Sequence, residues 1–393
     1  MELSSLRGAA GRLRADRTLR ALGDWIEAWR GPGSLWRARL CREHPVHSAE
    51  GIDRGMTLGL ERWTREALAR LRAEELCDDA RVPQLTAVWL AGSIPTGTFA
   101  ALLLPLLAGS AIYVKPSSAD PVSPRLLADS LRAVDSELAR AVAVGDDPRA
   151  LTDSDAVVVY GRDETVAELR AVVPVSLPFM GYGHKLSAAA LGAEAEIDPA
   201  VRALALEVAL YDGRGCLSPA FGFIEDRPAG RAQQVAECLS SALQQLEREL
   251  PCGSWTAAEQ AKLHELRKAL AMRADAQVWA SRGTLGWTVV LSRFESSPPI
   301  PGSLRVIPLV PVRDLDEVGS WLSGLRPHLA CVGQAGWGER RSALGRQVLH
   351  AGGSRLCPLG RMQAPPLAWR HDGQPPIRPL LRTLDVEDPE PSA

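Results

Sequence analysis

The sequence lacks any segment long and apolar enough to cross a membrane, and it lacks paired cysteines. Its longest apolar run, from Phe99 to Val114, is broken by Pro105 and Gly109 and is shorter than the roughly 20 residues that a membrane-spanning helix needs. The N-terminus has no apolar leader, so we expect a cytoplasmic protein without membrane insertion. None of the seven cysteines forms a CxxC pair, so we expect neither a metal site nor disulfides.

Lysine is scarce, and charges of opposite sign nearly cancel. The formal net charge of −2 gives no basis for a nucleic-acid partner. Of the 45 lysines and arginines, only Lys115, Lys185, Lys262 and Lys268 are lysines. A lysine kept in so arginine-rich a chain suits a position that needs a compact ammonium, although codon usage alone can also account for the bias. Two of the four lie in the motifs described below.

Four regions of the chain differ in pattern. Residues 1–80 are predicted to form helices with arginine-rich polar faces, a helical lead-in that packs on the main body. Residues 81–213 alternate short apolar strands with helices, which predicts a parallel sheet covered on both faces, as in a Rossmann-type nucleotide-binding domain. Residues 214–357 repeat this alternation as a second α/β domain, and residues 358–393 form a proline-rich, mostly irregular tail.

Apolar runs and helical spacing of apolar residues predict the elements of the two α/β domains. The strands are expected at 86–90, 111–114, 156–160, 175–180, 221–225, 287–294, 305–310 and 329–332. The helices are expected at 97–108, 123–139, 163–172, 199–211, 230–250, 256–272, 314–325 and 338–350.

A Lys-Pro pair ends one of the expected strands. Lys115 follows the strand 111–114, and Pro116 stops that strand. The carboxyl end of a parallel strand is where a nucleotide ribose or phosphate binds, and lysine can supply either a point charge or a donor. A Lys-Pro pair alone is common at strand ends. Here Gly109 and Val114 precede it, and this longer pattern is a more specific sign of a nucleotide site.

Two glycine-containing turns follow strands in the same region. Residues 91–97 form a turn before an apolar helix, where backbone amides can face a ligand, although ordinary strand-to-helix turns look alike. Gly181 and Gly183 follow another strand and let the backbone approach a cofactor. His184 follows them as a candidate general base or cofactor contact; most single histidines are structural hydrogen-bonding residues instead.

One cysteine differs from the other six in its surroundings. Cys216 lies in the sequence Gly-Arg-Gly-Cys-Leu-Ser-Pro, between a glycine-rich turn and an apolar strand. Such a loop can present the sulfur to a pocket and turn backbone N–H groups towards a developing oxyanion. Because the thiolate is the nucleophile, we expect Arg214 or a nearby His184 to lower the thiol pKa or to accept its proton. A buried, inert thiol is the alternative.

These segments, in this order, resemble the aldehyde dehydrogenase superfamily. They resemble more closely the acyl-CoA reductase family that includes the fatty-acid reductase component of bacterial luminescence systems. The resemblance runs from about Val88 to Thr383 and does not extend to residues 1–80. The stretches that carry it are 155–165 (DAVVVYGRDET), 181–184 (GYGH), 216–219 (CLSP) and 360–373 (GRMQAPPLAWRHDG).

The resemblance implies a Rossmann-type cofactor domain, an α/β catalytic domain with Cys216 as nucleophile, and a homo-oligomer. Lys115 takes the adenosine-ribose position beside Pro116. Gly181 and Tyr182 lie where the pyrophosphate and nicotinamide side of the cofactor pass.

Three departures from the superfamily pattern refine the expected activity. Aldehyde-oxidising members have glutamate three residues after the lysine, but this chain has Ser118, which removes repulsion against a 2′-phosphate and favours NADPH. Their Glu-Leu-Gly-Gly segment, whose glutamate activates the deacylating water, is absent; the nearby segment 191–196 does not match it. Many relatives have asparagine, an oxyanion donor, where this chain has the shorter Ser93.

The sequence therefore predicts NADPH-dependent reduction of an acyl thioester, from acyl-CoA or an acyl carrier, to an aldehyde through an acyl group bound to Cys216. Three alternatives stay open. The protein could be an oxidative aldehyde dehydrogenase, or an acyl transferase or thioesterase that uses Cys216 without a redox cofactor. It could also be a non-catalytic member that binds a nucleotide or a partner protein.

Overall fold

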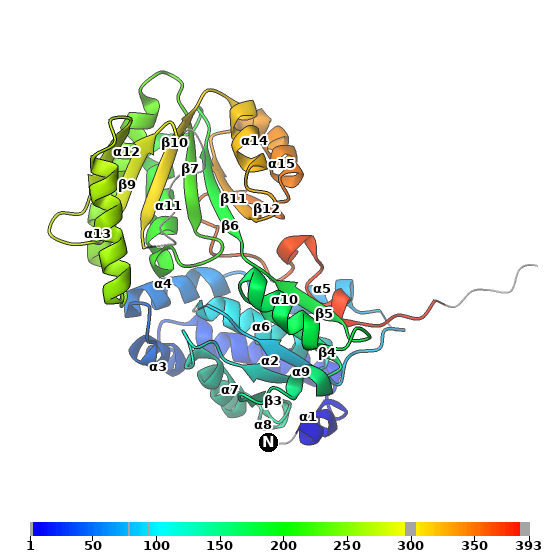
Figure 1. Cartoon of the computed structure of the whole chain (residues 1–393). Coiled ribbons are helices and arrows are strands. Elements are labelled where there is room, and N and C mark those ends of the chain that lie inside the picture. Colours follow the sequence, from blue (N-terminus) through cyan, green and yellow to red (C-terminus); the bar gives the residue numbers. More distant parts are fainter. Residues whose placement is uncertain (1–2, 78, 93, 295–303, 386–393) are drawn as a thin grey trace, which may run out of the picture.

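The computed structural model describes residues 3–77, 79–92, 94–294 and 304–385. Two lobes, each built on its own β-sheet, stack one above the other, and the C-terminal segment runs between them (Figure 1). Every strand pairing but one, that of β8 with β9, is parallel. The alternating pattern of the sequence therefore corresponds to a parallel α/β architecture, as predicted.

Helices at the N-terminus pack against the first lobe. Their core is aromatic: the rings of Trp25, Trp29 and Trp63 lie edge-on around Phe99, at centroid distances of 4.4, 6.1 and 5.8 Å. Both Trp25 and Trp29 donate their indole N–H to Ser130 Oγ, so these buried polar groups are satisfied. These helices are α1 (Leu3–Ala10), α2 (Ala15–Arg30), α3 (Leu35–Glu43), α4 (Ala49–Leu60) and α5 (Arg65–Glu75).

The first lobe contains a five-stranded parallel sheet in the order β3-β2-β1-β4-β5. The predicted apolar run divides at Gly109, whose φ of 103° ends a buried helix before the next strand begins. Within the described residues, no helix is long and apolar enough to span a bilayer. The strands are β1 (Leu85–Trp89), β2 (Ala111–Lys115), β3 (Val142–Val144), β4 (Ala156–Tyr160) and β5 (Phe179–Tyr182); the helices are α6 (Pro95–Ala108), α7 (Ser123–Val134), α8 (Ser136–Ala139), α9 (Ala150–Asp153) and α10 (Asp163–Val172).

The second lobe contains a seven-stranded sheet in the order β12-β11-β6-β7-β10-β9-β8, with β8 antiparallel at one edge. Helices α11 and α12 contribute to the core on one face, and α14 and α15 to the core on the other. The strands are β6 (Leu186–Leu191), β7 (Pro219–Glu225), β8 (Ala276–Ala280), β9 (Thr288–Ser292), β10 (Val306–Val312), β11 (Leu329–Ala335) and β12 (Arg355–Pro358); the helices are α11 (Ile197–Ala209), α12 (Arg231–Glu249), α13 (Ala257–Ala271), α14 (Leu315–Ser323) and α15 (Arg341–His350).

The chain passes from the first sheet to the second between Tyr182 and Leu186, earlier than the boundary predicted at residues 213 and 214. The reason is β6, which the sequence did not reveal. Its sequence is Leu-Ser-Ala-Ala-Ala-Leu, without the β-branched residues that mark a strand. Pairing with β7 and β11 in the middle of the sheet fixes this segment as a strand.

The proline-rich segment after β12 returns to the first lobe and pairs with it. Arg81 and Arg382 exchange backbone hydrogen bonds of 2.7 and 3.1 Å, and the Arg378 N–H donates to Glu75 at 3.0 Å. Nearer its start, the backbone N–H of Met362 donates to the buried Glu207 carboxylate at 2.6 Å. Residues 359–382, called the C-terminal strap from here on, therefore bridge the two lobes.

A buried ion pair anchors the loop between α11 and β7. Asp212 and Arg305 are 2.8 Å apart, and their side chains are 2% and 3% exposed. Arg305 also donates to the carbonyls of Leu250 and Pro251, and Asp212 accepts from the Gly253 N–H. Because each charged group also has these backbone partners, the pair joins the loop to β10 and to the end of α12.

We expect Asp212→Ala to lower the free energy of unfolding by about 3–5 kcal/mol, since it leaves a buried arginine without its counter-charge. Urea unfolding followed by circular dichroism would measure the loss. The matched control is Glu43→Ala, which breaks the exposed pair with Arg39 and should cost no more than about 1 kcal/mol. Equal losses in the free energy of unfolding would show that the buried pair stabilises the fold no more than the exposed pair does.

Candidate active site

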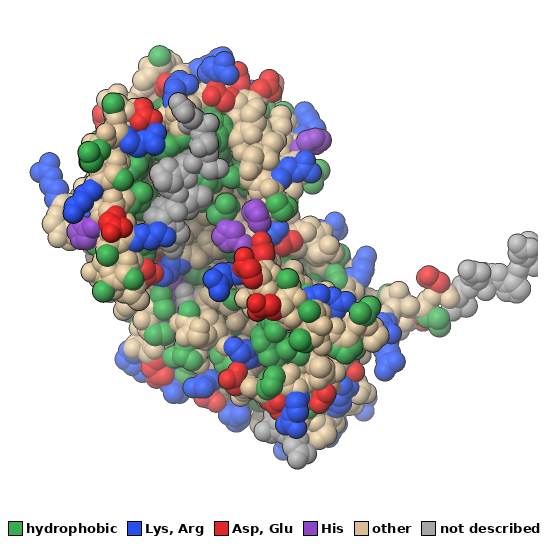
Figure 2. All heavy atoms as spheres, viewed as in Figure 1, with side chains coloured by type: hydrophobic (Ala, Val, Ile, Leu, Met, Phe, Trp, Pro, Cys, Tyr) green, Lys and Arg blue, Asp and Glu red, His purple; other side chains and the backbone are tan. Residues whose placement is uncertain are grey.

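A cavity of about 820 Å³ lies between the two lobes. Its walls come mainly from the end of α4, the carboxyl ends of β1, β4 and β5, helix α6, the loop before β7, and the C-terminal strap. Single residues of α11 and α13 and the start of β10 complete the wall. Over the outer junction of the lobes, histidine and acidic side chains gather on the surface (Figure 2). His184, His328 and Asp163 lie close to one another: the two imidazole rings are 5.8 Å apart, and Asp163 is 3.8 Å from the His328 imidazole.

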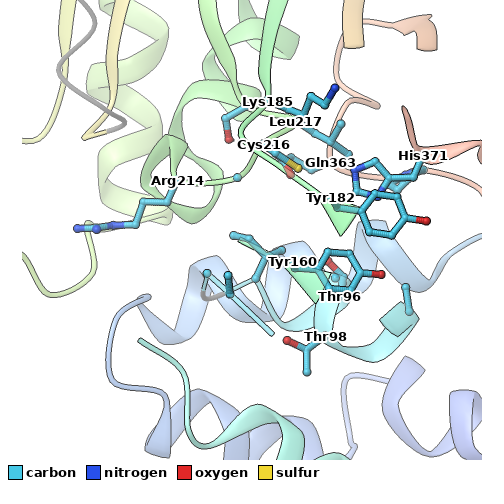
Figure 3. Close-up of a pocket in the computed structure, with 18 of the residues that line it drawn as sticks. Thr96, Thr98, Tyr160, Tyr182, Lys185, Arg214, Cys216, Leu217, Gln363 and His371 are labelled. Carbon is cyan, nitrogen blue, oxygen red and sulfur yellow. Dashed lines mark hydrogen bonds between the residues drawn. The ribbon is translucent and has the colours of Figure 1, made fainter. Parts of the chain in front are cut away.

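Cys216 lies on the loop between α11 and β7 and faces this cavity (Figure 3). Three consecutive residues, Tyr211, Asp212 and Gly213, have positive φ values and turn the chain sharply before it. The Cys216 carbonyl accepts a 2.7 Å hydrogen bond from Ser187 Oγ of β6. The loop that carries the sulfur is thus shaped by the turn at residues 211–213 before Cys216 and tied to β6 by the Ser187 hydrogen bond.

The structure does not lower the pKa of the Cys216 thiol as expected. Although the residue is exposed to the cavity, the cavity lies deep between the lobes, and burial followed by the negative charge of Asp372 raises the thiol pKa to about 11. Arg214 points away from the sulfur and pairs with Glu259 at 2.7 Å (Figure 3). The backbone N–H groups of Cys216 and Leu217 favour the thiolate but do not outweigh burial. At neutral pH the sulfur is therefore protonated.

A column of four aromatic rings lies against the cavity. Tyr160 stacks on Tyr182 at 4.9 Å, Tyr182 on His371 at 4.2 Å, and His371 on Trp369 at 4.5 Å. The first two rings come from β4 and β5, and the other two come from the C-terminal strap. Burial raises the pKa of both tyrosines well above its ordinary value, so both keep their protons.

His371 is a site residue that the sequence did not single out. Burial lowers its pKa to about 4, although the neighbouring Asp372 carboxylate acts in the opposite direction. Lys185 lies 3.5 Å from Asp372 and also donates to the Pro327 carbonyl at 3.2 Å. The imidazole is therefore neutral at physiological pH. The only sequence signal was its place in the segment 360–373, which resembled the family without periodicity or spacing of its own.

Among the residues predicted for the site, Cys216, Tyr182, Gly183 and His184 line one cavity. The His184 backbone N–H donates to Asp163 at 2.7 Å, and within the described residues no hydrogen bond joins its imidazole to Cys216. A side chain at position 183 would collide with the Asp163 carboxylate, which explains that glycine. Ser93 lies outside the described residues.

The other predicted cofactor residues lie outside the cavity wall but on the same edge of the sheet. Lys115 and Pro116 stand at the carboxyl end of β2, with Ser118 exposed just beyond, and the Lys115 ammonium is 4.0 Å from Asp146. The ends of the neighbouring strands β1, β4 and β5 reach the cavity at Gly92, at Gly161 and at Gly183, respectively. The carboxyl ends of four adjacent strands thus form a continuous edge, with a cation at its far end. This arrangement fits an extended dinucleotide.

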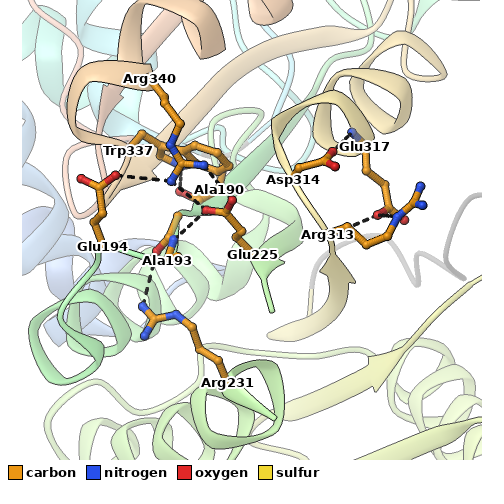
Figure 4. A network of polar contacts seen from close by, with 11 residues as sticks. Ala190, Ala193, Glu194, Glu225, Arg231, Arg313, Asp314, Glu317, Trp337 and Arg340 are labelled. Atoms are coloured by element: carbon orange, nitrogen blue, oxygen red, sulfur yellow. Dashed lines mark hydrogen bonds and ion pairs between the residues drawn. The ribbon is translucent and has the colours of Figure 1, made fainter. Parts of the chain in front are cut away.

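No carboxylate lines the cavity within the described residues. The segment 191–196 lies at the carboxyl end of β6, where Glu194 and Glu225 contact Arg340 (Figure 4). Glu225 also accepts a 2.8 Å hydrogen bond from the Ala193 N–H. These carboxylates therefore stabilise the second lobe and do not face the cysteine.

A model of the acyl-CoA reductase (LuxC) family matches residues 64–383. The chain belongs to this family. The long-chain acyl-protein thioester reductase of Aliivibrio fischeri is 22% identical over 191 residues, which cover 46% of this chain and 38% of that protein. The family assignment predicted from the sequence is confirmed.

Solved structures confirm the aldehyde dehydrogenase fold. An oxidoreductase from Marinobacter aquaeolei has a TM-score of 0.73 at 13% identity, over 93% of this chain and 82% of that chain. The aldehyde dehydrogenase AldH of Staphylococcus aureus has a TM-score of 0.70 at 13% identity, over 96% and 90%. The putative aldehyde dehydrogenase PutA of Anabaena variabilis has a TM-score of 0.69 at 16% identity, over 99% and 94%.

We expect Asp372→Asn to lower the pKa of the Cys216 thiol. Removing a negative charge stabilises the thiolate, so alkylation of Cys216 at pH 9 should speed up by up to about tenfold, which corresponds to about one pKa unit. Asparagine suits this position, since φ of residue 372 is 53°.

Mass spectrometry of the Cys216 peptide would follow the reaction with iodoacetamide, because Cys77 is exposed as well. Asp275→Asn, on the surface of the second lobe, is the control and should leave the rate unchanged. A slower reaction of the Asp372→Asn protein would contradict the electrostatic assignment.

Proposed function

We propose that the protein reduces an acyl thioester to an aldehyde with NADPH, through an acyl group bound to Cys216. The observation that carries this proposal is that Cys216 faces the same cavity that the carboxyl ends of β1, β4 and β5 reach, where a dinucleotide fits. No glutamate lines the described wall in the place of the one that activates the deacylating water in aldehyde-oxidising relatives, which disfavours an oxidative aldehyde dehydrogenase.

In this mechanism the Cys216 sulfur attacks the thioester carbonyl and the leaving thiol departs. The backbone N–H groups of Cys216 and Leu217, which already face the sulfur, stabilise the negative charge on the carbonyl oxygen. Bound NADPH supplies the hydride that converts the acyl group to the aldehyde. Tyr160 and Tyr182 line the same cavity and keep their protons, so neither adds a negative charge beside the cysteine.

Residues on the sheet edge are suited to hold the cofactor. Lys115 offers an ammonium to a phosphate or ribose, and Ser118 leaves room for a 2′-phosphate. Gly181 and Gly183 let the backbone approach, with Tyr182 beside the nicotinamide side. The glyceraldehyde-3-phosphate dehydrogenase of Bacillus halodurans, which shares the fold at 13% identity, was solved in complex with NADP.

The acyl chain is expected along the apolar part of the wall. Trp63, Ile94, Leu104, Pro365 and Leu367 line this part, which joins the N-terminal helices to the C-terminal strap. A wall of this kind favours a hydrocarbon chain over a polar substrate. The Aliivibrio fischeri relative is a long-chain acyl-protein thioester reductase, which supports an acyl group carried on a protein as donor, and the acyl-CoA reductase family supports acyl-CoA.

We expect Cys216→Ala to abolish acyl-dependent NADPH consumption, with a loss of at least about 10³-fold, because the covalent intermediate cannot form. Purified protein would be assayed with acyl-CoAs from butanoyl to hexadecanoyl, and the aldehyde would be quantified. Cys77→Ala, at an exposed cysteine outside the cavity, should keep full activity. Full activity of the Cys216→Ala protein would overturn the proposal.

We expect Ser118→Glu to shift preference from NADPH towards NADH by at least about tenfold, or about 1.4 kcal/mol. A carboxylate there would repel the 2′-phosphate and accept hydrogen bonds from an unmodified ribose. Titration of both nucleotides by calorimetry would measure the change, with Ser241→Glu in the second lobe as control. An unchanged ratio would place the adenosine ribose away from Ser118.

A further inference from the structure

A proton must move twice when Cys216 is acylated, and the structure limits which group can carry it. This inference rests on the proposed function. The thiol holds its proton in the resting protein, since burial and the charge of Asp372 raise its pKa to about 11. Attack on a thioester therefore needs a group that removes this proton, and the departing thiolate needs a group that returns one.

Few side chains in the cavity can do both. Tyr160 and Tyr182 stay protonated and cannot accept a proton. The Lys185 ammonium is engaged with Asp372 and with the Pro327 carbonyl. Lys262 and the arginines of the wall are cationic side chains and do not serve as proton acceptors. Among the described residues of the wall, this leaves two imidazoles, those of His184 and His371.

The two histidines differ in how they are held. His184 is exposed at the outer junction of the lobes, and its ring lies 5.8 Å from the ring of His328. His371 is fixed between Tyr182 and Trp369, at ring distances of 4.2 and 4.5 Å and interplanar angles of 11° and 25°. The His371 Nε2 lies 3.9 Å from the Asp372 carboxylate, beyond hydrogen-bond distance, so this neutral, fixed ring can still accept a proton.

Asp372 links His371 to the nucleophile. Its carboxylate lies 3.9 Å from the His371 Nε2, and both His371 and Cys216 line the same cavity. After burial, the negative charge of Asp372 is the next cause of the raised pKa of the Cys216 thiol. Lys185 contacts the same carboxylate at 3.5 Å, and the turn at 371–373, with φ of 53° at Asp372, aims the imidazole into the column. In Figure 3, Lys185 and His371 lie around Cys216 on the side of Tyr182.

We propose that His371 is the proton carrier of the acylation step. Its imidazole takes the S–H proton as the bond between Cys216 Sγ and the acyl carbon forms. The bond between that carbon and the leaving sulfur then breaks, and the imidazolium gives the proton to the departing thiolate. No electron or proton is gained or lost overall. While both charges exist, thiolate and imidazolium stabilise each other, which raises the pKa of His371 and lowers that of Cys216.

The test isolates acylation from reduction. Protein would be mixed, without NADPH, with each acyl-CoA of the panel from butanoyl to hexadecanoyl, and the reaction would be quenched at intervals. Mass spectrometry would then measure the fraction of protein that carries an acyl group on Cys216. In His371→Phe, which keeps a ring in the column, the acylation rate should fall by about 10²–10⁴-fold while NADPH binding stays unchanged. His350→Phe, exposed on α15 outside the cavity, is the control and should acylate at the wild-type rate.

A second variant covers the case in which phenylalanine disturbs the fold. His371→Ala leaves a gap that free imidazole can fill, and the acylation rate should recover in proportion to the unprotonated imidazole as pH is varied. If His371 only supported the stacked rings, the acylation rate would not depend on how much of the added imidazole is unprotonated. An acylation rate that recovers without this dependence would overturn the role of His371 as proton carrier.

The outcomes separate the two proposals. If wild-type protein forms no acyl-Cys216 with any acyl-CoA, the proposed function and this role fall together. If wild-type protein is acylated and His371→Phe is acylated as fast, only the role of His371 is overturned. If His184→Phe loses acylation and His371→Phe does not, the proton passes through His184 and the assignment to His371 is wrong.

Discussion

The ion pair between Asp212 and Arg305 is the interaction on which the site depends. Asp212 lies four residues before Cys216, in a run of positive φ values that would not hold its shape alone. By joining that run to the start of β10 and to the end of α12, the pair fixes where the loop enters the cavity. The Ser187 hydrogen bond to the Cys216 carbonyl holds the same loop four residues further on. Stability and nucleophile position are thus determined by the same buried charges.

The cavity exists because the C-terminal strap returns to the first lobe. Glu207 accepts the Met362 N–H, and one residue further Gln363 donates to Ser218 at 2.7 Å, two residues beyond the nucleophile. Further on, the strap supplies Trp369 and His371 and then pairs with Arg81. A segment without regular secondary structure therefore closes the site and contributes rings to it. Because its backbone is anchored at both ends, these rings keep a fixed place relative to the loop.

Sequence reasoning recovered the parts of this molecule that local pattern determines. The apolar strands β1, β2 and β4 and the glycine-rich setting of Cys216 were visible because they depend on neighbours in the chain. The short β3 was missed, and the strand predicted at 175–180 begins only at Phe179. The alanine-rich β6 was missed because its strand form comes from pairing with β7 and β11. His371 was missed as a site residue because its importance comes from contact with Tyr182, far away in sequence. The expected lowering of the Cys216 pKa failed because burial and the charge of Asp372 raise it, and because Arg214 is bound to Glu259.

The high thiol pKa and the low imidazole pKa are two results of one constraint, the cost of burying charge. In an apolar cavity, Cys216 is most stable as a thiol and His371 as a neutral ring, so neither side chain is charged in the resting site. A free thiolate there would react with any electrophile that enters. Separating the charges becomes favourable only when an acyl thioester lies close enough for its carbonyl oxygen to reach the loop amides, because the negative charge then moves onto that oxygen. The burial that makes this cysteine a poor nucleophile in the empty protein thereby makes its reaction depend on a correctly placed substrate.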